Sequence, residues 1–124
     1  MSLTAPEMSE RAYRLASLLA GHSPEIAAVI AGETNRCINE LLNDSLPKAV
    51  ETIDFFARSL QFLQTKFEYK SPAKKYSPVG RVAAITPWND PPVAFAWKVI
   101  PALLTRNDVL WKPSEYLNDS SRMI

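Results

Sequence analysis

The first half of the chain carries apolar residues at helical spacing. A stripe of apolar side chains, three and four positions apart, covers residues 8–19 and stops at Gly21, a residue typical of helix ends. A second helix is predicted to begin at Ser23, which suits an N-cap, with Pro24 in its first turn and its end near Gly32 or Glu33. The amino-terminal region is therefore expected to be helical.

The longest helical pattern follows a short polar connection. Apolar side chains recur three and four positions apart over residues 46–63. Asp44 or Ser45 is expected to cap this helix, and Pro47 fits in its first turn. Beyond the pattern, residues 66–77 are basic and show no clear period, so we interpret them as a loop or an irregular strand.

Two short apolar runs, at residues 80–86 and 108–112, predict strands in the second half of the chain. The run from Val82 to Ile85 contains no polar alternation. A parallel strand that is buried on both faces has this pattern, whereas a strand with one solvated face alternates. We therefore expect both faces of this strand to be covered.

A helix is predicted between the two strands. Apolar side chains recur at helical spacing from Val93 to Leu104, and Pro91 and Pro92 stand where a helix begins and a missing N–H does no harm. Pro101 lies inside the pattern and is expected to kink or locally break the helix. Strand, helix and strand together predict one βαβ unit.

The predicted fold class is α/β, with amino-terminal helices followed by a βαβ unit. The chain divides into a helical region at 6–65, a connection at 66–77 and the βαβ region at 78–124. Ligands of parallel α/β sheets bind beyond the carboxyl ends of the strands. Here these ends carry polar groups, in Thr86 to Asn89 and in Lys112 to Glu115, so a binding site is expected there.

Charge and composition exclude several classes of function. The 124 residues suit one domain, and the formal net charge of +1 comes from scattered Lys and Arg residues, so no nucleic-acid partner is expected. No apolar run approaches the roughly 18 residues that span a bilayer, and the amino end lacks a signal core. We expect a soluble cytoplasmic protein with no membrane partner.

Single residues with reactive or bulky side chains receive a structural interpretation first. Cys37 and His22 are too few for a metal site, so no metal is expected; Cys37 is interpreted as a buried or half-buried small side chain. His22 is expected at the surface or at a helix C-terminus. Tryptophan side chains are more often part of the core than in contact with a ligand, so the core is the expected place of Trp88, Trp97 and Trp111.

The second half nevertheless resembles a known family. The resemblance rests, in order and spacing, on Ala84-Ile85-Thr86-Pro87-Trp88-Asn89, Trp97-Lys98, Pro101-Ala102-Leu103, Asn107 and Lys112-Pro113-Ser114-Glu115. These segments are similar to the amino-terminal part of the coenzyme domain of aldehyde dehydrogenases, and Glu33-Thr34 and Phe55-Phe56-Ala57 are similar to the preceding helices. The resemblance implies an incomplete, doubly wound dinucleotide-binding domain.

The resemblance also implies an activity and the residues that take part in it. Aldehyde dehydrogenases oxidise an aldehyde to a carboxylic acid through a cysteine thiohemiacetal, and a nicotinamide cofactor accepts the hydride. Asn89 matches the asparagine that donates to the developing oxyanion, and Lys98 matches a lysine that is sometimes assigned to charge relay. The implied cofactor wall and ribose site comprise Ile85, Thr86, Pro87, Trp88, Asn89, Lys112, Pro113, Ser114 and Glu115.

The implied cofactor is NAD, with NADP possible, because a carboxylate such as Glu115 favours a free ribose 2′-hydroxyl. The implied partners are a small-molecule aldehyde and, for the whole enzyme, further copies of itself. The family's glutamate base and cysteine nucleophile have no counterparts in this sequence, and Cys37 does not replace the latter. The chain by itself is therefore expected to be inactive.

Two departures from the family pattern leave alternatives open. Asp90 follows Asn89 where an aromatic residue is usual, so either the substrate pocket is altered or Asp90 points away; Arg106 stands in place of a glycine. These departures motivate a second hypothesis, a non-catalytic interaction module. A third is an acylating or acyl-phosphate-reducing relative. Asn89 could also simply cap the following helix, and Lys112 and Glu115 could be solvated surface charges.

Overall fold

The computed structural model describes residues 4–68 and 77–124, and for residues 61–68 it describes the helical backbone alone. In chain order the elements are α1 (Ala5–Gly21), α2 (Ser23–Thr34), α3 (Ile38–Glu40), the π-helix η1 (Leu41–Ser45), α4 (Leu46–Glu68), β1 (Arg81–Ile85), α5 (Pro91–Leu104), β2 (Asp108–Lys112) and α6 (Ser120–Met123). The predicted order of helices followed by a βαβ unit is confirmed. The predicted connection at 66–77 is helical up to Glu68, and its residues 69–76 lie outside the described part.

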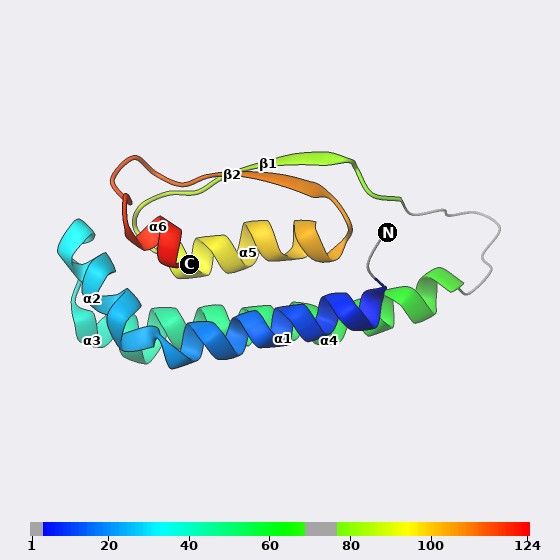
Figure 1. Cartoon of the computed structure of the whole chain (residues 1–124), viewed down its shortest axis with the longest axis horizontal. Coiled ribbons are helices and arrows are strands. Elements are labelled where there is room, and N and C mark those ends of the chain that lie inside the picture. The colour runs from blue at the N-terminus through cyan, green and yellow to red at the C-terminus, as the bar shows by residue number, and fades with distance from the viewer. Residues whose placement is uncertain (1–3, 69–76) are drawn as a thin grey trace.

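Three layers stack in Figure 1: the helix pair α1 and α4, then α5, then the two-stranded sheet. Small buried side chains, Ala12 and Ala16 on α1 and Ala49 and Ala57 on α4, belong to the core between these layers. The buried hydroxyl of Ser9 donates a hydrogen bond to the carbonyl of Ala57 at 2.9 Å, which ties α1 to α4. The helix pair is therefore the base on which α5 rests.

The junction between α1 and α2 differs from the prediction. His22, not Ser23, holds the position between the helices, and its N–H donates to the carbonyl of Leu18 at 3.0 Å. The hydroxyl of Ser23 donates back to the carbonyl of Leu19 at 2.9 Å, so Ser23 does not cap α2. The expectation for Ser23 was wrong because its hydroxyl finds an acceptor in the preceding turn, whereas the expected position of His22 is confirmed.

The predicted N-cap at Asp44 or Ser45 is also wrong, because the helix begins earlier. Residues 38–45 are already helical, and η1 widens the turn so that the N–H of Leu46 bonds to the carbonyl of Leu41. Pro47 follows directly; it lacks an N–H and disturbs an ordinary α-helical turn. Asp44 instead pairs with the Lys48 ammonium at 3.0 Å.

The sheet has the predicted parallel pairing, and its register runs from Arg81 opposite Asp108 to Ile85 opposite Lys112. Burial alternates along both strands: Ala84 is buried, whereas Ile85 is 72% and Leu110 67% exposed. The expectation that β1 is covered on both faces is therefore wrong for the described residues. Helix α5 covers one face of the sheet, and no other described element packs on the opposite face.

Helix α5 continues past Pro101 to Leu104, so the predicted break does not occur. Its end is closed by two reversed hydrogen bonds, from Arg106 N–H to the Leu103 carbonyl at 2.9 Å and from Asn107 N–H to the Ala102 carbonyl at 3.1 Å. This is the Schellman arrangement, which places its C′ residue in the left-handed region. Arg106 occupies that position with φ 63°.

Helix α6 returns the end of the described chain to α2. The carboxylate of Glu33 accepts hydrogen bonds from the N–H of Asp119 at 2.7 Å, from the N–H of Ser120 at 3.3 Å and from the Ser120 hydroxyl. Burial by itself raises the pKa of Glu33, but the Ser120 hydroxyl and the backbone N–H groups outweigh it, and the net pKa is lowered. The segment after β2 is thereby held against α2.

Among the described helices, none is by itself long and apolar enough to cross a membrane; α1 and α2 meet that test only as a pair bent by 70°.

Candidate functional site

The carboxyl ends of β1 and β2 lie side by side, on the same side of the molecule as α2, α3 and α6 (Figure 1). Beyond the last paired residues, Ile85 and Lys112, the N–H of Thr86 donates to the Lys112 carbonyl at 3.2 Å. The indole N–H of Trp111 donates to the Thr86 hydroxyl oxygen at 2.9 Å, and Thr86 is 3% exposed. The two predicted site segments are thus joined at their bases.

Aromatic and apolar groups line the exposed side of these strand ends. Trp88 is 45% exposed, and its ring meets that of Tyr116 edge-on with centroids 6.4 Å apart. The expectation that tryptophans fill the core holds for Trp111, which packs on Phe95 at 4.8 Å, but is wrong for the exposed Trp88 and Trp97. Tyr116 was missed by sequence reasoning, although it directly follows the Lys-Pro-Ser-Glu segment.

Lys112 and Glu115 project from the end of β2 and from the turn after it, and both are exposed. The Lys112 ammonium donates only weakly, to the Pro113 carbonyl at 3.3 Å, and the Glu115 carboxylate accepts from the Ser114 hydroxyl at 3.5 Å. Within the described ranges neither charge forms an ion pair. Both side chains are therefore open to a ligand.

Asn89 stands in the turn between β1 and α5, with its side chain exposed. Its carbonyl accepts a hydrogen bond from Arg36 Nη1 at 2.9 Å, so the backbone of this turn is fixed from the helical layer. The alternative that Asn89 caps α5 is wrong, because Asp90 occupies the N-cap position. The Asn89 carboxamide has no hydrogen-bond partner among residues 4–60 and 77–124, which suits a donor for a ligand.

Asp90 faces the helical layer rather than the exposed strand ends. Its Oδ1 lies 3.4 Å from Arg36 Nη1, and its Oδ2 accepts from the Ser45 hydroxyl at 3.3 Å. The open alternative is thereby resolved in favour of Asp90 pointing away. Sequence reasoning missed Arg36 and Ser45, because contacts across 53 and 45 positions leave no periodic signal.

The remaining predicted residues lie apart from this cluster. Lys98 is exposed on α5, about 10 Å along the helix from its start at a rise of 1.5 Å per residue. Cys37 is exposed, so its expected burial is wrong; it lies in the extended segment between α2 and α3. The described residues contain no cluster of three metal-binding side chains.

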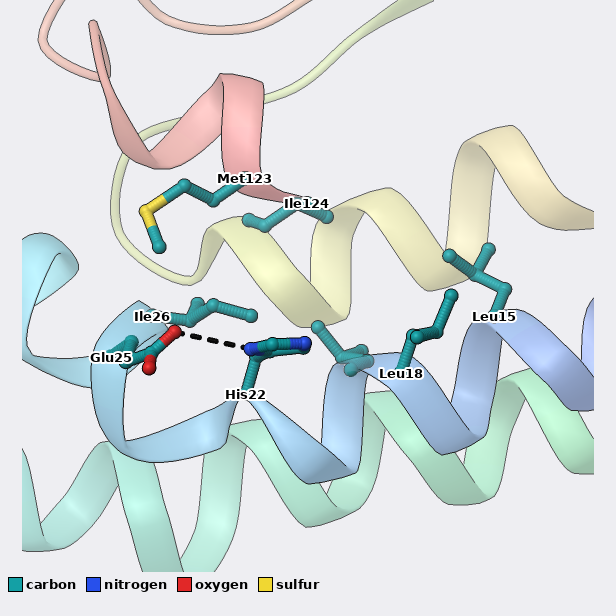
Figure 2. A pocket seen from close by; sticks show the side chains of 8 residues that line it. Leu15, Leu18, His22, Glu25, Ile26, Met123 and Ile124 are labelled. Carbon is teal, nitrogen blue, oxygen red and sulfur yellow. Dashed lines mark hydrogen bonds and ion pairs between the residues drawn. The ribbon is translucent and has the colours of Figure 1, made fainter.

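A hollow of about 350 Å³ opens elsewhere, between α1, α2 and α6 (Figure 2). Its walls are mainly apolar, and at its edge His22 Nδ1 lies 3.1 Å from Glu25 Oε2. The hollow is lined by Leu15, Leu18, Leu19, His22, Glu25, Ile26, Met123 and Ile124. None of these residues belongs to the strand ends.

The fold and the paired strand ends define a Rossmann-like α/β protein. The sequence profile described as the Aldehyde dehydrogenase family matches residues 1–123. The chain belongs to the aldehyde dehydrogenase family.

Individual relatives agree with this assignment. The NADP/NAD-dependent aldehyde dehydrogenase PuuC of Escherichia coli is 33% identical over an alignment of 119 residues, and the match covers 92% of this chain and 24% of that protein. Gamma-glutamyl-gamma-aminobutyraldehyde dehydrogenase from Burkholderia cenocepacia superposes with a TM-score of 0.86 at 28% identity, over 98% of this chain and 26% of that one. An indole-3-acetaldehyde dehydrogenase complexed with NAD+ superposes at 0.84 and 28%, with the same coverage. The chain thus spans about a quarter of the length of these relatives.

Proposed function

We propose that this chain is the amino-terminal portion of an NAD(P)-dependent aldehyde dehydrogenase, which oxidises an aldehyde to a carboxylic acid. The observation that carries the proposal is the meeting of residues 85–89 and 112–115 at the joined ends of two parallel strands. Ligands of such sheets bind at this edge. The chemistry of the side chains at this edge indicates the role of each.

Lys112 and Glu115 are proposed to hold the ribose on the adenine side of the cofactor. The ammonium donates to hydroxyl oxygens, and the carboxylate accepts from hydroxyl groups. The exposed faces of Ile85, Pro87 and Trp88 supply an apolar wall beside them. This donor set suits a nucleoside, and the bound NAD(P) would supply the hydride acceptor.

Asn89 is proposed to donate its carboxamide N–H to the oxygen of the aldehyde as that oxygen becomes negative. A fixed neutral donor of this kind lowers a barrier by roughly 3 to 4 kcal/mol in comparable oxyanion sites. Cys37, which is exposed in the extended segment before α3, is not proposed as the thiol that attacks the aldehyde carbon. The 124-residue chain is therefore expected to bind cofactor weakly without oxidising aldehydes.

The proposal is tested by titrating NAD into the 15N-labelled chain and following the indole signals of its three tryptophans. We expect the Trp88 indole to shift saturably, while Trp97, exposed on α5, serves as an internal control. Lys112→Ala and Glu115→Gln should each weaken binding about tenfold, since a hydrogen bond to a charged group contributes roughly 1.5 kcal/mol or more. Lys48→Ala, another exposed lysine, should leave binding unchanged.

The proposed cofactor site is contradicted if Trp88 does not respond to NAD, or if Lys112→Ala and Lys48→Ala bind alike. Cofactor preference is tested with the same signals. Because a carboxylate repels a 2′-phosphate, NAD should bind more tightly than NADP, and Glu115→Gln should narrow the difference. An unchanged ratio in this variant would remove Glu115 from the recognition of the ribose.

The two departures that motivated the non-catalytic alternative, Asp90 and Arg106, both have explanations that do not involve the proposed site. Asp90 is turned toward Arg36, away from the strand ends. Arg106 occupies the left-handed position at the end of α5, where a glycine is favoured for backbone reasons alone. Neither departure changes the exposed donors of the proposed site.

A further inference from the structure

Arg36 lies at the centre of a polar cluster beneath the turn that carries Asn89. Its side chain is 15% exposed, although arginine is rarely so buried without partners. Nη1 donates to the Asn89 carbonyl at 2.9 Å and lies 3.4 Å from Asp90 Oδ1. Nη2 donates to Glu40 Oε1 at 2.8 Å and to the Ser45 hydroxyl oxygen at 3.1 Å. The planar guanidinium thus joins the segment after α2 and the helix that follows it to the β1–α5 turn.

Ser45 links Arg36 to the same turn by a second route, through Asp90. Ser45 is fully buried in η1; its oxygen accepts from Arg36 and its hydroxyl donates to Asp90 Oδ2 at 3.3 Å. The only described partner of the buried Asp90 Oδ1 is the Arg36 charge. Residues 89 and 90 are therefore held at three atoms, the Asn89 carbonyl oxygen and the two carboxylate oxygens of Asp90. The side chain of Asn89 itself is exposed.

We propose that Arg36 is a positioning residue for Asn89: it fixes the backbone from which the carboxamide reaches the reacting oxygen, and it neutralises the carboxylate next to it. The inference rests on the proposed function of Asn89 as the oxyanion donor. A donor held in advance loses no free energy to reorientation during the reaction. An unneutralised Asp90 would oppose the negative charge that develops on the aldehyde oxygen. Arg36 serves both requirements with one side chain.

The test compares three variants of the 124-residue chain by NMR: Arg36→Gln, Asp90→Asn and the double variant. Arg36→Gln removes the bond to the Asn89 carbonyl but also leaves Asp90 buried without a counter-charge, which can unfold the chain. The double variant removes both charges and still lacks the bond. Asp90→Asn is the matched control, because it keeps the bond from Arg36 to Asn89.

We expect the Asn89 carbonyl 13C signal to move upfield, and the Asn89 backbone N–H to lose order on the nanosecond timescale, in the double variant and in folded Arg36→Gln. Asp90→Asn should leave both signals near their wild-type values, and the Trp111 indole, bonded to Thr86, should not move in any variant. An unshifted carbonyl signal and unchanged backbone order at Asn89 in the double variant overturn the inference.

The NMR signals of Asn89 separate this inference from the proposed function. These signals do not require cofactor or substrate. If the Trp88 indole does not shift with NAD, but the Asn89 backbone loses order without Arg36, the cofactor proposal is refuted and the positioning role stands. Saturable NAD binding with an Asn89 that is indifferent to Arg36 supports the proposed function and refutes the positioning role.

Discussion

Where α5 meets β1, the Asn107 side chain joins the two elements: Oδ1 accepts from the Gly80 N–H at 3.0 Å, and Nδ2 donates to the Ala102 carbonyl at 3.0 Å and to Thr105 Oγ1 at 2.9 Å. At the opposite end of the same βαβ unit, the hydrogen bonds that Lys112 and Glu115 make within the described residues are long and go to adjacent residues. At the first end, which we call the closed end (Gly80, Ala102, Thr105 and Asn107), the polar groups bond to one another and hold the unit together. At the second, the open end (residues 85–89 and 112–115), polar side chains remain available to a ligand. Two asparagines, Asn107 and Asn89, mark the two ends.

The largest expected effect comes from breaking the closed end. Asn107→Ala removes four side-chain hydrogen bonds, one of them long at 3.5 Å, and should lower the free energy of unfolding by about 2 to 3 kcal/mol. Asn89→Ala, the matched change at the open end, should change it by less than about 0.5 kcal/mol, because the carboxamide is exposed. Urea denaturation measures both. Equal losses in the two variants would show that the two ends are not built differently.

Relieving strain at the closed end should have a smaller effect of opposite sign. Arg106 has φ 63°, a conformation that costs a residue with a Cβ roughly 1 kcal/mol. Arg106→Gly should therefore raise the free energy of unfolding by about that amount, visible as a higher melting temperature. Arg106→Ala is the control: it keeps the Cβ and should bring no comparable gain. A gain that is equal for glycine and alanine would assign the effect to the charge.

The pH dependence of stability should report the hydrogen bonds from Asp119 and Ser120 to the Glu33 carboxylate, the tether that holds the segment after β2 against α2. The folded-state pKa of Glu33 is lowered, so its contribution is fully present above the pKa of the unfolded chain and is lost as the pH falls through the folded value. Glu33→Gln should destabilise the chain by about 1 kcal/mol at neutral pH, and the difference should shrink in acid. Urea midpoints at several pH values measure this, with Glu25→Gln on the same helix as the control. A difference that is constant with pH would contradict the tether.

Sequence reasoning found the open end because its residues are contiguous. Segments 85–89 and 112–115 each follow a recognisable strand, and parallel strands bring their carboxyl ends to one edge, so their meeting could be predicted before any contact was known. The closed end was found only in part. Asn107 was noted for its resemblance alone, since its bond to Gly80 spans 27 positions and depends on the end of α5 lying against the start of β1.

Errors arose where a local pattern had two tertiary outcomes. The run from Val82 to Ile85 is apolar throughout and was interpreted as buried on both faces, yet a strand with α5 on one side exposes alternate side chains. Ser23 and Ser45 both suit an N-cap, but each hydroxyl meets a different partner, the Leu19 carbonyl and the Asp90 carboxylate. Neither partner can be identified from the neighbouring residues alone.

The sequence by itself determined the longer helices, the two strands, their order and the two motifs at the strand ends, because these depend on side chains within a few positions of one another. Tertiary structure decided which sheet face is covered, that Asp90 turns toward Arg36, and that the Glu33 carboxylate accepts hydrogen bonds from the start of α6. These outcomes depend on the free energy of burying charged and polar groups from distant segments together. Such pairs exist only once the helical layer and the βαβ unit have packed.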